Sequence, residues 1–284
     1  MLQNVENAVD VPFTLKPVGG YVGAEILDID LAELQAPSTY AAIRAALSRH
    51  GVLFFRDQRL DVGQYVCFGE QFGQLEDNDT LAHVAGFPQV GELVKEADHV
   101  TSIGDMWHVD HTYLPAPMRY TMLRAIQLPP HGGDTLFLSA KAAFAALPEA
   151  IKEMLRSLRA LHSRSYLIRD ARVAAQFFKE RPPKSTKQER NKTAVHPAVI
   201  RLPESGEEVL FVNPGYVVKF DGWTSKLSQG LLDSLFEHSF QPEYQCRFQW
   251  RPGSIVIWDN LQTWHFAVND YHGHRRSMQR LVIR

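Results

Sequence analysis

The sequence lacks the features that mark secreted, membrane-spanning and nucleic-acid-binding proteins. Its 284 residues include only two cysteines, Cys67 and Cys246, which we interpret as buried free thiols in a reducing cytoplasm rather than as a disulfide. No uncharged run approaches the roughly eighteen residues that cross a bilayer, and the first thirty residues contain acids and prolines where a signal peptide is apolar. The formal net charge of −2 gives no electrostatic reason to bind nucleic acid or a membrane. We therefore expect a cytoplasmic protein without either partner.

Short strand-like segments dominate what is present. They are rich in β-branched and aromatic residues and are separated by Gly, Pro, Asn and Asp. They cover residues 24–31, 51–56, 120–128, 208–220, 244–250, 254–259 and 278–283. Helical patterns are fewer and cover residues 38–50, 61–72, 148–160 and 224–239. Because strands and helices do not alternate regularly, the sequence predicts a mostly β protein, an antiparallel sandwich or barrel with flanking helices.

No repeat and no long linker divides the chain, so we predict a single domain over residues 1–284. One compositional break is present at residues 179–193 (KERPPKSTKQERNKT), which contain almost no apolar side chains. Such a composition is typical of a solvated segment. We predict a mobile loop at about 167–195, either a simple surface loop or a lid over a site.

The run GDMWHVDHTY at residues 104–113 brings three metal-capable side chains together: His108, Asp110 and His111. We expect this run to be extended. Side chains at positions i and i+2 of a strand point to the same face, so His108 and Asp110 converge while His111 is turned away. A His-x-Asp pair with one distant histidine is the two-histidine, one-carboxylate arrangement of non-heme Fe(II) sites. The run therefore predicts two ligands of such a site.

A second signal lies at residues 257–280, IWDNLQTWHFAVNDYHGHRRSMQR. His265 follows a strand-like segment there, and Arg275, Arg276 and Arg280 come shortly after it. Because guanidinium groups bind carboxylates in a bidentate manner, this order predicts a metal ligand and a carboxylate site in one cavity. Arg276 and Arg280 share strand parity and are predicted to face inward, whereas Arg275 faces solvent. Surface charge is the alternative interpretation for all three arginines.

A series of short sequence blocks extends over nearly the whole chain. In order, the blocks read LKPVGGYVGAEILDIDL, HGVLFFRDQ, FGEQFG, WHVDHTYLPAP, HGGDTLFLS, VHPAVIRLPESG, LFVNPGY and IWDNLQTWHFAVNDY, followed by RR and R. In this order they resemble the taurine dioxygenase and 2,4-dichlorophenoxyacetate dioxygenase (TauD/TfdA) family of Fe(II)/2-oxoglutarate-dependent dioxygenases. The resemblance implies a double-stranded β-helix, the cupin-like jelly roll.

The resemblance also implies roles for individual residues. Fe(II) would be bound by His108, Asp110 and His265, and the distal carboxylate of the cosubstrate 2-oxoglutarate by Thr135 and Arg276. The substrate would contact Arg280, His111 and Tyr216. Relatives usually have a small or apolar residue at the position of His111, so this histidine either recognises an acidic or hydrogen-bonding group or forms part of a polar cavity wall.

The expected reaction is hydroxylation of a small anionic substrate by O2, with release of succinate and CO2. The substrate classes are aryloxyalkanoates, which the sequence favours slightly, alkyl sulfonates and sulfate esters. We also expect a homodimer or homotetramer, as is common among relatives. Two alternatives are a metal-dependent hydrolase, since HVDH resembles part of an HxHxDH run in which Met106 replaces the first histidine, and a non-catalytic jelly-roll binding protein.

Overall fold

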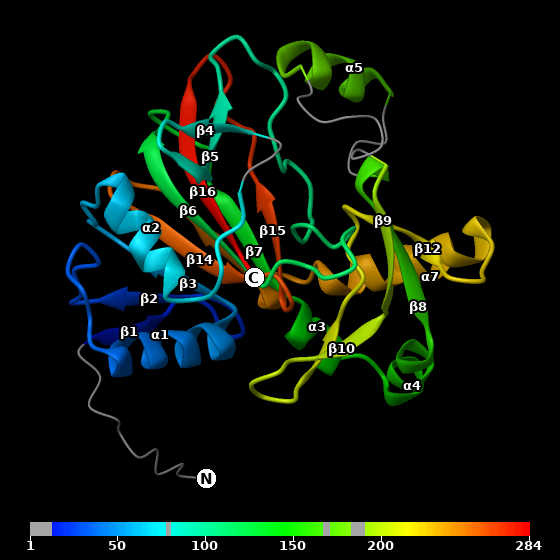
Figure 1. The fold of residues 1–284 in the computed structure, drawn as a ribbon. Helices are drawn as coiled ribbons and strands as arrows, with labels where there is room; N and C mark the ends of the chain where they lie inside the picture. Colours follow the sequence, from blue (N-terminus) through cyan, green and yellow to red (C-terminus); the bar gives the residue numbers. More distant parts are fainter. Residues whose placement is uncertain (1–12, 78–80, 167–170, 183–190) are drawn as a thin grey trace.

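Two layers of β-sheet form the centre of the computed structural model, which describes residues 13–77, 81–166, 171–182 and 191–284 (Figure 1). Neighbouring strands of the larger, eight-stranded sheet are antiparallel, except β2 and β3, which are parallel. Its strands, in spatial order, are β1 (Thr14–Pro17), β2 (Ala24–Leu27), β3 (Val52–Phe55), β14 (Ile255–Asp259), β6 (Tyr120–Gln127), β16 (Arg276–Ile283), β5 (Phe87–Lys95) and β4 (Ala82–Val84). This sheet carries most of the segments predicted as strands.

A three-stranded antiparallel sheet packs against one face of the large sheet. It contains β13 (Gln245–Phe248), β7 (Thr135–Ser139) and β15 (Thr263–Ala267). Val256 and Trp258 of β14 point into the core between the sheets, together with Phe54 and Phe137. Successive side chains of a strand alternate between its two faces, so Ile255 and the other intervening residues of β14 point to the opposite face.

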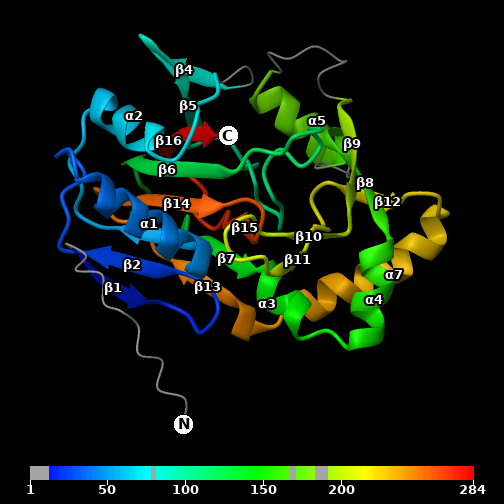
Figure 2. The same ribbon diagram turned by 60° about the horizontal axis from the view of Figure 1, so that its bottom comes forward.

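Two helices cover that opposite face of the large sheet: α1 (Pro37–His50) and α2 (Val62–Glu70), as Figure 2 shows. Ile43 and Tyr65 of these helices join one apolar cluster with Ile255 of β14. Helix α2 begins after Asp61, whose side chain accepts a hydrogen bond from the Gln64 backbone, while the Gln64 side chain accepts one from the Asp61 backbone. Burial on both faces explains the uninterrupted apolar sequences of β3 and β14.

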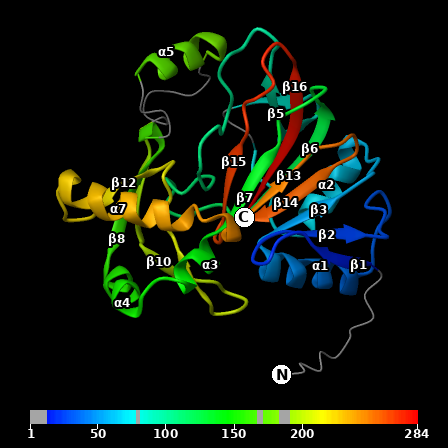
Figure 3. The ribbon, with the colours of Figure 1, turned by 180° about the vertical axis from the view of Figure 1, so that it is seen from behind.

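The remaining elements lie at the other end of the sandwich from α1 and α2 (Figure 3). Two small sheets belong to this part, formed by β12 (Val217–Phe220), β8 (Arg159–Ser163) and β9 (Thr193–Pro197), and by β10 (Val199–Arg201) and β11 (Glu208–Leu210). Its helices are α3 (Ala140–Ala145), α4 (Glu149–Ser157) and α7 (Ser225–Ser239). They share a separate apolar cluster that includes Phe144, Leu155 and Leu232, and this cluster supports the segment that carries residues 107–109.

The mostly β architecture with flanking helices is confirmed, but the predicted strand at residues 208–220 is wrong as a single element. It divides into β11 and β12, which belong to different sheets. Between them the chain turns at Asn213, whose side chain accepts a hydrogen bond from the Tyr216 backbone. An asparagine that bonds to the backbone ahead of Pro214 and Gly215 is a turn signal inside an otherwise apolar run.

The predicted loop at about 167–195 contains a helix, α5 (Ala171–Glu180), so the loop interpretation is wrong for these ten residues. The end of α5 is tied to the 100–101 segment, since the Arg181 side chain donates hydrogen bonds to the carbonyl and the hydroxyl oxygen of Thr101. Residues 167–170 and 183–190 lie outside the described residues, so the mobility of the segment stays a prediction. The assignment of residues 1–284 to one domain also stays a prediction.

The structure also bears on membrane-spanning helices and on the two cysteines. Among the described residues, no helix combines the length and the apolar character needed to cross a membrane. Both cysteines are free, but only Cys246 is buried, and the expectation that Cys67 is buried is wrong. Cys67 lies on the side of α2 that faces away from the sheet, because Val66 and Phe68 occupy the buried side.

His162 of β8 makes stability depend on pH. Its ring is fully buried, packs against His196 and Phe211, and has no hydrogen-bond partner on either nitrogen among the described residues. Burial, with a smaller contribution from His196, lowers the pKa of His162 to about 3 from its usual 6.5. Below pH 6.5 the unfolded chain therefore binds a proton that the folded chain does not, so stability falls with falling pH.

We expect His162→Phe to reduce the stability lost between pH 7 and pH 5. Removing one such group should reduce this loss by about 2 kcal/mol, at about 1.4 kcal/mol per pH unit below pH 6.5. The measurement is the free energy of unfolding in urea at both pH values. His272→Phe, at an exposed position, is the control. An unchanged pH dependence in His162→Phe would contradict the prediction.

Candidate active site

A single backbone bridge brings two predicted ligands together. The His108 backbone N–H donates to the His265 carbonyl at 3.1 Å, and the His265 N–H donates to the His108 carbonyl at 2.9 Å. Directly opposed residues of an antiparallel pair point to the same face, and the two ring centroids are 4.1 Å apart. The extended run predicted at residues 104–113 is wrong beyond this bridge, because turns and bends dominate the segment.

Gly215 makes room for His108 in this arrangement. A Cβ atom at Gly215 would lie 2.5 Å from the Cβ of His108 and 3.2 Å from its Cα. Real Cβ atoms do not approach this closely, so only glycine lets the turn between β11 and β12 pack against the His108 backbone. The same turn positions Tyr216, whose ring centroid is 6.3 Å from that of His108.

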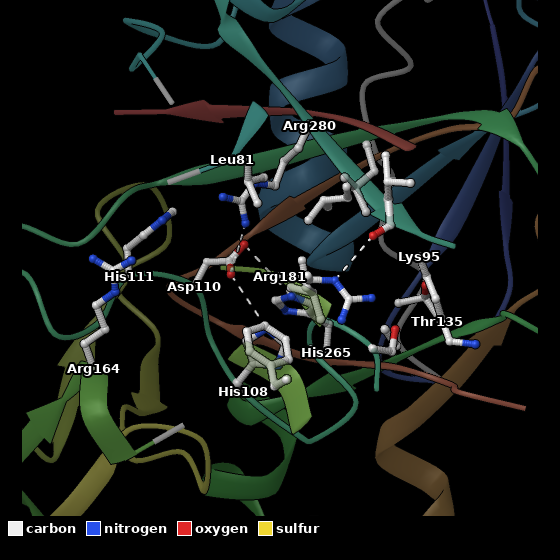
Figure 4. A pocket seen from close by; sticks show the side chains of 18 of the residues that line it. Leu81, Lys95, His108, Asp110, His111, Thr135, Arg164, Arg181, His265 and Arg280 are labelled. Carbon is white, nitrogen blue, oxygen red and sulfur yellow. Dashed lines mark hydrogen bonds and ion pairs between the residues drawn. The ribbon is translucent and has the colours of Figure 1, made fainter. Parts of the chain in front are cut away.

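Asp110 completes a buried cluster with the two histidines. Its Oδ1 lies 3.7 Å from Nε2 of His108 and its Oδ2 lies 4.0 Å from Nε2 of His265, and one ligand atom from each residue lies within 4.8 Å of the others. Nδ1 of His108 lies 2.8 Å from the Met106 carbonyl and donates to it, because a carbonyl oxygen can only accept, so Nε2 is the nitrogen on the side of Asp110. Figure 4 shows the three side chains converging on one point.

The charges of the cluster suit a cation. Burial alone would raise the pKa of Asp110, but His265 and Arg280 outweigh this effect and hold its pKa well below the usual range. Burial, followed by the charge of His108, lowers the pKa of His265 well below its usual value. An ionised carboxylate and neutral imidazoles are the protonation states in which these side chains bind metal.

A chain of buried hydrogen bonds orients Asp110. The Thr121 hydroxyl donates to Oδ2 of Asp110 at 2.9 Å, and the Asn260 side-chain amide donates to the Thr121 hydroxyl at 2.9 Å. The Trp258 indole N–H in turn donates to the Asn260 amide oxygen at 2.9 Å. The carboxylate is therefore held in place by a series of three side chains, from β6, from β14 and from the residue that follows β14.

Thr135 and Arg276 form a second group beside the cluster. Arg276 is only 8% exposed, and its Nε has no hydrogen-bond partner in the part of the chain that the structure describes. Trp250 donates to the Thr135 hydroxyl at 3.0 Å, and a Cβ atom at Gly133 would lie 3.2 Å from the Arg276 side chain. A buried guanidinium group without a carboxylate partner is a site for an external carboxylate.

The cluster and the group of Thr135 and Arg276 line one cavity of about 550 Å³. The predicted substrate residues Arg280, His111 and Tyr216 also line it. Arg280 and Arg276 both line it, as strand parity predicts, whereas Arg275 is not among the lining residues and pairs with Glu96 at 3.0 Å. Nη1 of Arg280 is 4.0 Å from Oδ1 of Asp110. The cavity therefore has a cation immediately beside the cluster.

The prediction that His111 is turned away is wrong. Its backbone is left-handed, with φ of 58°, and its side chain lines the cavity from the side of the cluster opposite Thr135 (Figure 4). Strand parity fails because the chain turns immediately after Asp110. Burial lowers the pKa of His111 to about 4 despite the nearby Asp110, so the ring is neutral at pH 7.

Four residues with parts in this site were missed by the sequence reasoning. His196 uses Nε2 to donate to the Thr112 and Leu114 carbonyls at 2.9 and 3.0 Å, which holds the turn after Asp110. Three cations also line the cavity: Lys95, Arg164 and Arg181. No spacing signal identifies the cations, because they come from β5, from the residue after β8 and from the residue after α5.

A family model described as "Taurine catabolism dioxygenase TauD, TfdA family" matches residues 14–282. The chain belongs to the TauD/TfdA family. It is 34% identical to an alkylsulfatase of Acinetobacter baylyi over 95% of this chain and 84% of that protein. It is 32% identical to an alpha-ketoglutarate-dependent sulfate ester dioxygenase of Pseudomonas putida over 94% of this chain and 88% of that protein.

Among solved structures, a taurine dioxygenase from Burkholderia xenovorans matches with a TM-score of 0.80 and 32% identity, over 96% of this chain and 90% of that one. This match confirms the jelly roll. As a TauD/TfdA member, the chain is a 2-oxoglutarate-dependent non-heme iron dioxygenase, and the cofactors of this class are Fe(II), 2-oxoglutarate and O2. The resemblance stated from the sequence is thereby confirmed.

We expect Thr121→Val to weaken Fe(II) binding about 10-fold, because loss of an outer hydrogen bond to a ligand typically has this effect. Valine retains the shape of threonine, so the fold should be kept. The measurement is a metal-affinity titration under anaerobic conditions. Thr263→Val is the matched control, since this buried hydroxyl donates to the Gly51 carbonyl and not to a residue of the cluster. Equal metal affinities of the two variants would contradict the role of Thr121.

Proposed function

We propose that His108, Asp110 and His265 bind Fe(II) as a facial triad. The support is the convergence of three buried ligand residues, in which the pKa values of Asp110 and His265 favour the metal-binding forms and Asp110 is fixed by Thr121. Two imidazoles and one carboxylate are the donor set of non-heme Fe(II) dioxygenases, and three protein ligands leave room for the cosubstrate and O2. This convergence is the observation that carries the proposed function.

We propose that Thr135 and Arg276 bind the distal carboxylate of 2-oxoglutarate. The support is the buried guanidinium group with an unpaired Nε, adjacent to a hydroxyl group held by Trp250. When bound, Fe(II) and 2-oxoglutarate supply an oxidant from O2 that hydroxylates the substrate, with succinate and CO2 as coproducts. The residues of the chain hold the cosubstrate in one orientation and keep water away from it.

We propose that the substrate is a small sulfate ester that binds to Arg280, His111 and Tyr216. Arg280 lies beside Asp110 in the cavity, so an anion bound to it has its neighbouring carbon near the cluster. Apolar side chains, including Leu93, Val94 and Phe177, line another part of the cavity and suit an alkyl group. The two relatives named for sulfate ester chemistry favour this class over the aryloxyalkanoates that the sequence favours.

Two features argue against the rival functions. A hydrolase of the HxHxDH type holds two metals, but the described residues contain one cluster of potential metal ligands, and it has three members. A non-catalytic protein would keep buried Arg276 and Asp110 at a cost in stability without any chemical use. The cytoplasmic location and the homodimer or homotetramer expected from the sequence stay predictions.

We expect the protein to develop a weak visible charge-transfer band when Fe(II) and 2-oxoglutarate are added anaerobically. His108→Ala should lose the band and at least about 100-fold of substrate-dependent succinate formation, because one of the three metal ligands is removed. The measurements are anaerobic titration and a succinate-release screen across sulfate esters, sulfonates and aryloxyalkanoates. Absence of the band in folded wild-type protein, or full activity of His108→Ala, would contradict the triad.

The two cavity arginines should have separable kinetic effects. We expect Arg280→Met to raise the KM for the substrate about 10-fold or more with little change in the KM for 2-oxoglutarate, and Arg276→Met to do the reverse. Each variant is the matched control of the other, since both remove one cavity-lining guanidinium group from β16. Steady-state kinetics with each ligand varied in turn measures the effect. Equal changes in both KM values for both variants would contradict the two separate sites.

A further inference from the structure

Lys95, at the end of β5, is a buried cation that the proposed function does not use. It is 3% exposed and lines the cavity. Its Nζ has no hydrogen-bond partner among the described residues and lies over the Tyr271 ring, 4.3 Å from the ring centroid. The ammonium group of Lys95 has therefore lost its hydration without gaining a paired carboxylate among the described residues.

Such a position is unfavourable in the absence of a ligand. Burying an ammonium group costs free energy unless hydrogen bonds and an opposite charge replace the lost hydration. The Tyr271 ring offsets part of this cost through a cation–π interaction but accepts no directed hydrogen bond. Burial, followed by the charge of Arg181, lowers the pKa of Lys95. An anion bound nearby would remove the imbalance.

The nearest acidic group is already occupied. Glu180 acts on Lys95 electrostatically, but its carboxylate accepts hydrogen bonds from the backbone of Val100 and Thr101, from the Thr101 hydroxyl and from Gln176. It also pairs with Arg181 at 3.2 Å. These partners hold Glu180 at the junction of α5 and the 100–101 segment, so the anion that matches Lys95 is not this carboxylate.

The position of Lys95 identifies the ligand group. In the antiparallel pairing of β5 and β16, Lys95 is directly opposite Arg276, so the two side chains emerge on the same face. Both cations flank Tyr271, since the Arg276 guanidinium carbon is 6.0 Å from the centroid of that ring. In Figure 4, Lys95 and Thr135 lie on one side of the triad, and His111 and Arg164 lie on the other.

We propose that Lys95 and Arg276 together form the subsite for the distal carboxylate of the cosubstrate. Lys95 donates a charge-assisted hydrogen bond to a carboxylate oxygen, while Arg276 binds the group through its planar fork. The subsite thereby selects a 2-oxo dicarboxylate over a 2-oxo monocarboxylate. The inference rests on the proposed function, since it requires 2-oxoglutarate to lie between the triad and these two residues.

The test compares two cosubstrates that differ only in the distal group. Mn(II)-loaded wild-type protein and Lys95→Met are titrated calorimetrically with 2-oxoglutarate and with 2-oxovalerate, in which a methyl group replaces the distal carboxylate. We expect Lys95→Met to weaken 2-oxoglutarate binding about 10- to 100-fold, the range for a hydrogen bond between charged groups. Binding of 2-oxovalerate should remain within about 2-fold, since it has no group for Lys95 to contact.

Arg275→Met is the matched control, because it removes a neighbouring cation that pairs with Glu96 and lies outside the set of cavity-lining residues. It should bind both ligands as the wild type does. Thermal melting adds a readout that does not require catalysis. Without ligands, Lys95→Met should melt at or above the wild-type temperature, because an uncompensated buried charge has been removed. The rise in melting temperature caused by 2-oxoglutarate should be smaller than in the wild type.

The possible outcomes separate the inference from the proposed function. Unchanged 2-oxoglutarate affinity in Lys95→Met, or equal losses for 2-oxoglutarate and 2-oxovalerate, overturns the role of Lys95 while leaving the dioxygenase function intact. Failure of the Mn(II)-loaded wild type to bind 2-oxoglutarate overturns both. A loss confined to 2-oxoglutarate, with Arg275→Met unchanged, supports the subsite.

Discussion

The pair of backbone hydrogen bonds between His108 and His265 is the constraint on which the rest of the site depends. It joins a segment dominated by turns to β15, an element of the small sheet, and sets both imidazoles side by side. Asp110 follows two residues later and is fixed by Thr121 from the opposite sheet. The cluster is therefore assembled across the sandwich rather than on one strand, and its geometry is retained only while both layers stay packed.

The packing of the large sheet explains how the site can be both polar and buried. Along β14, Ile255 packs toward α1 and α2, whereas Val256 packs between the sheets. Trp258 belongs to the inner set, where its indole N–H supports Asn260 and its ring lies 4.7 Å from that of His265. Apolar side chains thus exclude water around the polar cluster, while the hydrogen bonds that link Trp258 through Asn260 and Thr121 to Asp110 are all formed.

Sequence patterns could predict the features that depend on local order. The short His-x-Asp motif distinguishes His108 and Asp110 from the other potential ligands. Arg276 and Arg280 are predictable because side chains four residues apart on a strand point to the same face. His111 could not be predicted correctly, because its left-handed backbone breaks the strand parity on which the inference rested. Lys95 could not be predicted either, since its partner Arg276 is specified by the register of β5 against β16, which no local pattern encodes.

The charge balance of the cavity links these observations. The titratable residues that line it include one carboxylate, Asp110, but also Lys95, Arg164, Arg181, Arg276 and Arg280. A bound divalent metal would add two positive charges, which Asp110 and one carboxylate of 2-oxoglutarate would neutralise. In the functions proposed above, the distal carboxylate of 2-oxoglutarate would balance Lys95 and Arg276, and an anionic substrate would balance Arg280. Each bound anion therefore reduces the repulsion among the cavity cations. A site with surplus positive charge favours a dianionic cosubstrate together with an anionic substrate over neutral analogues of either.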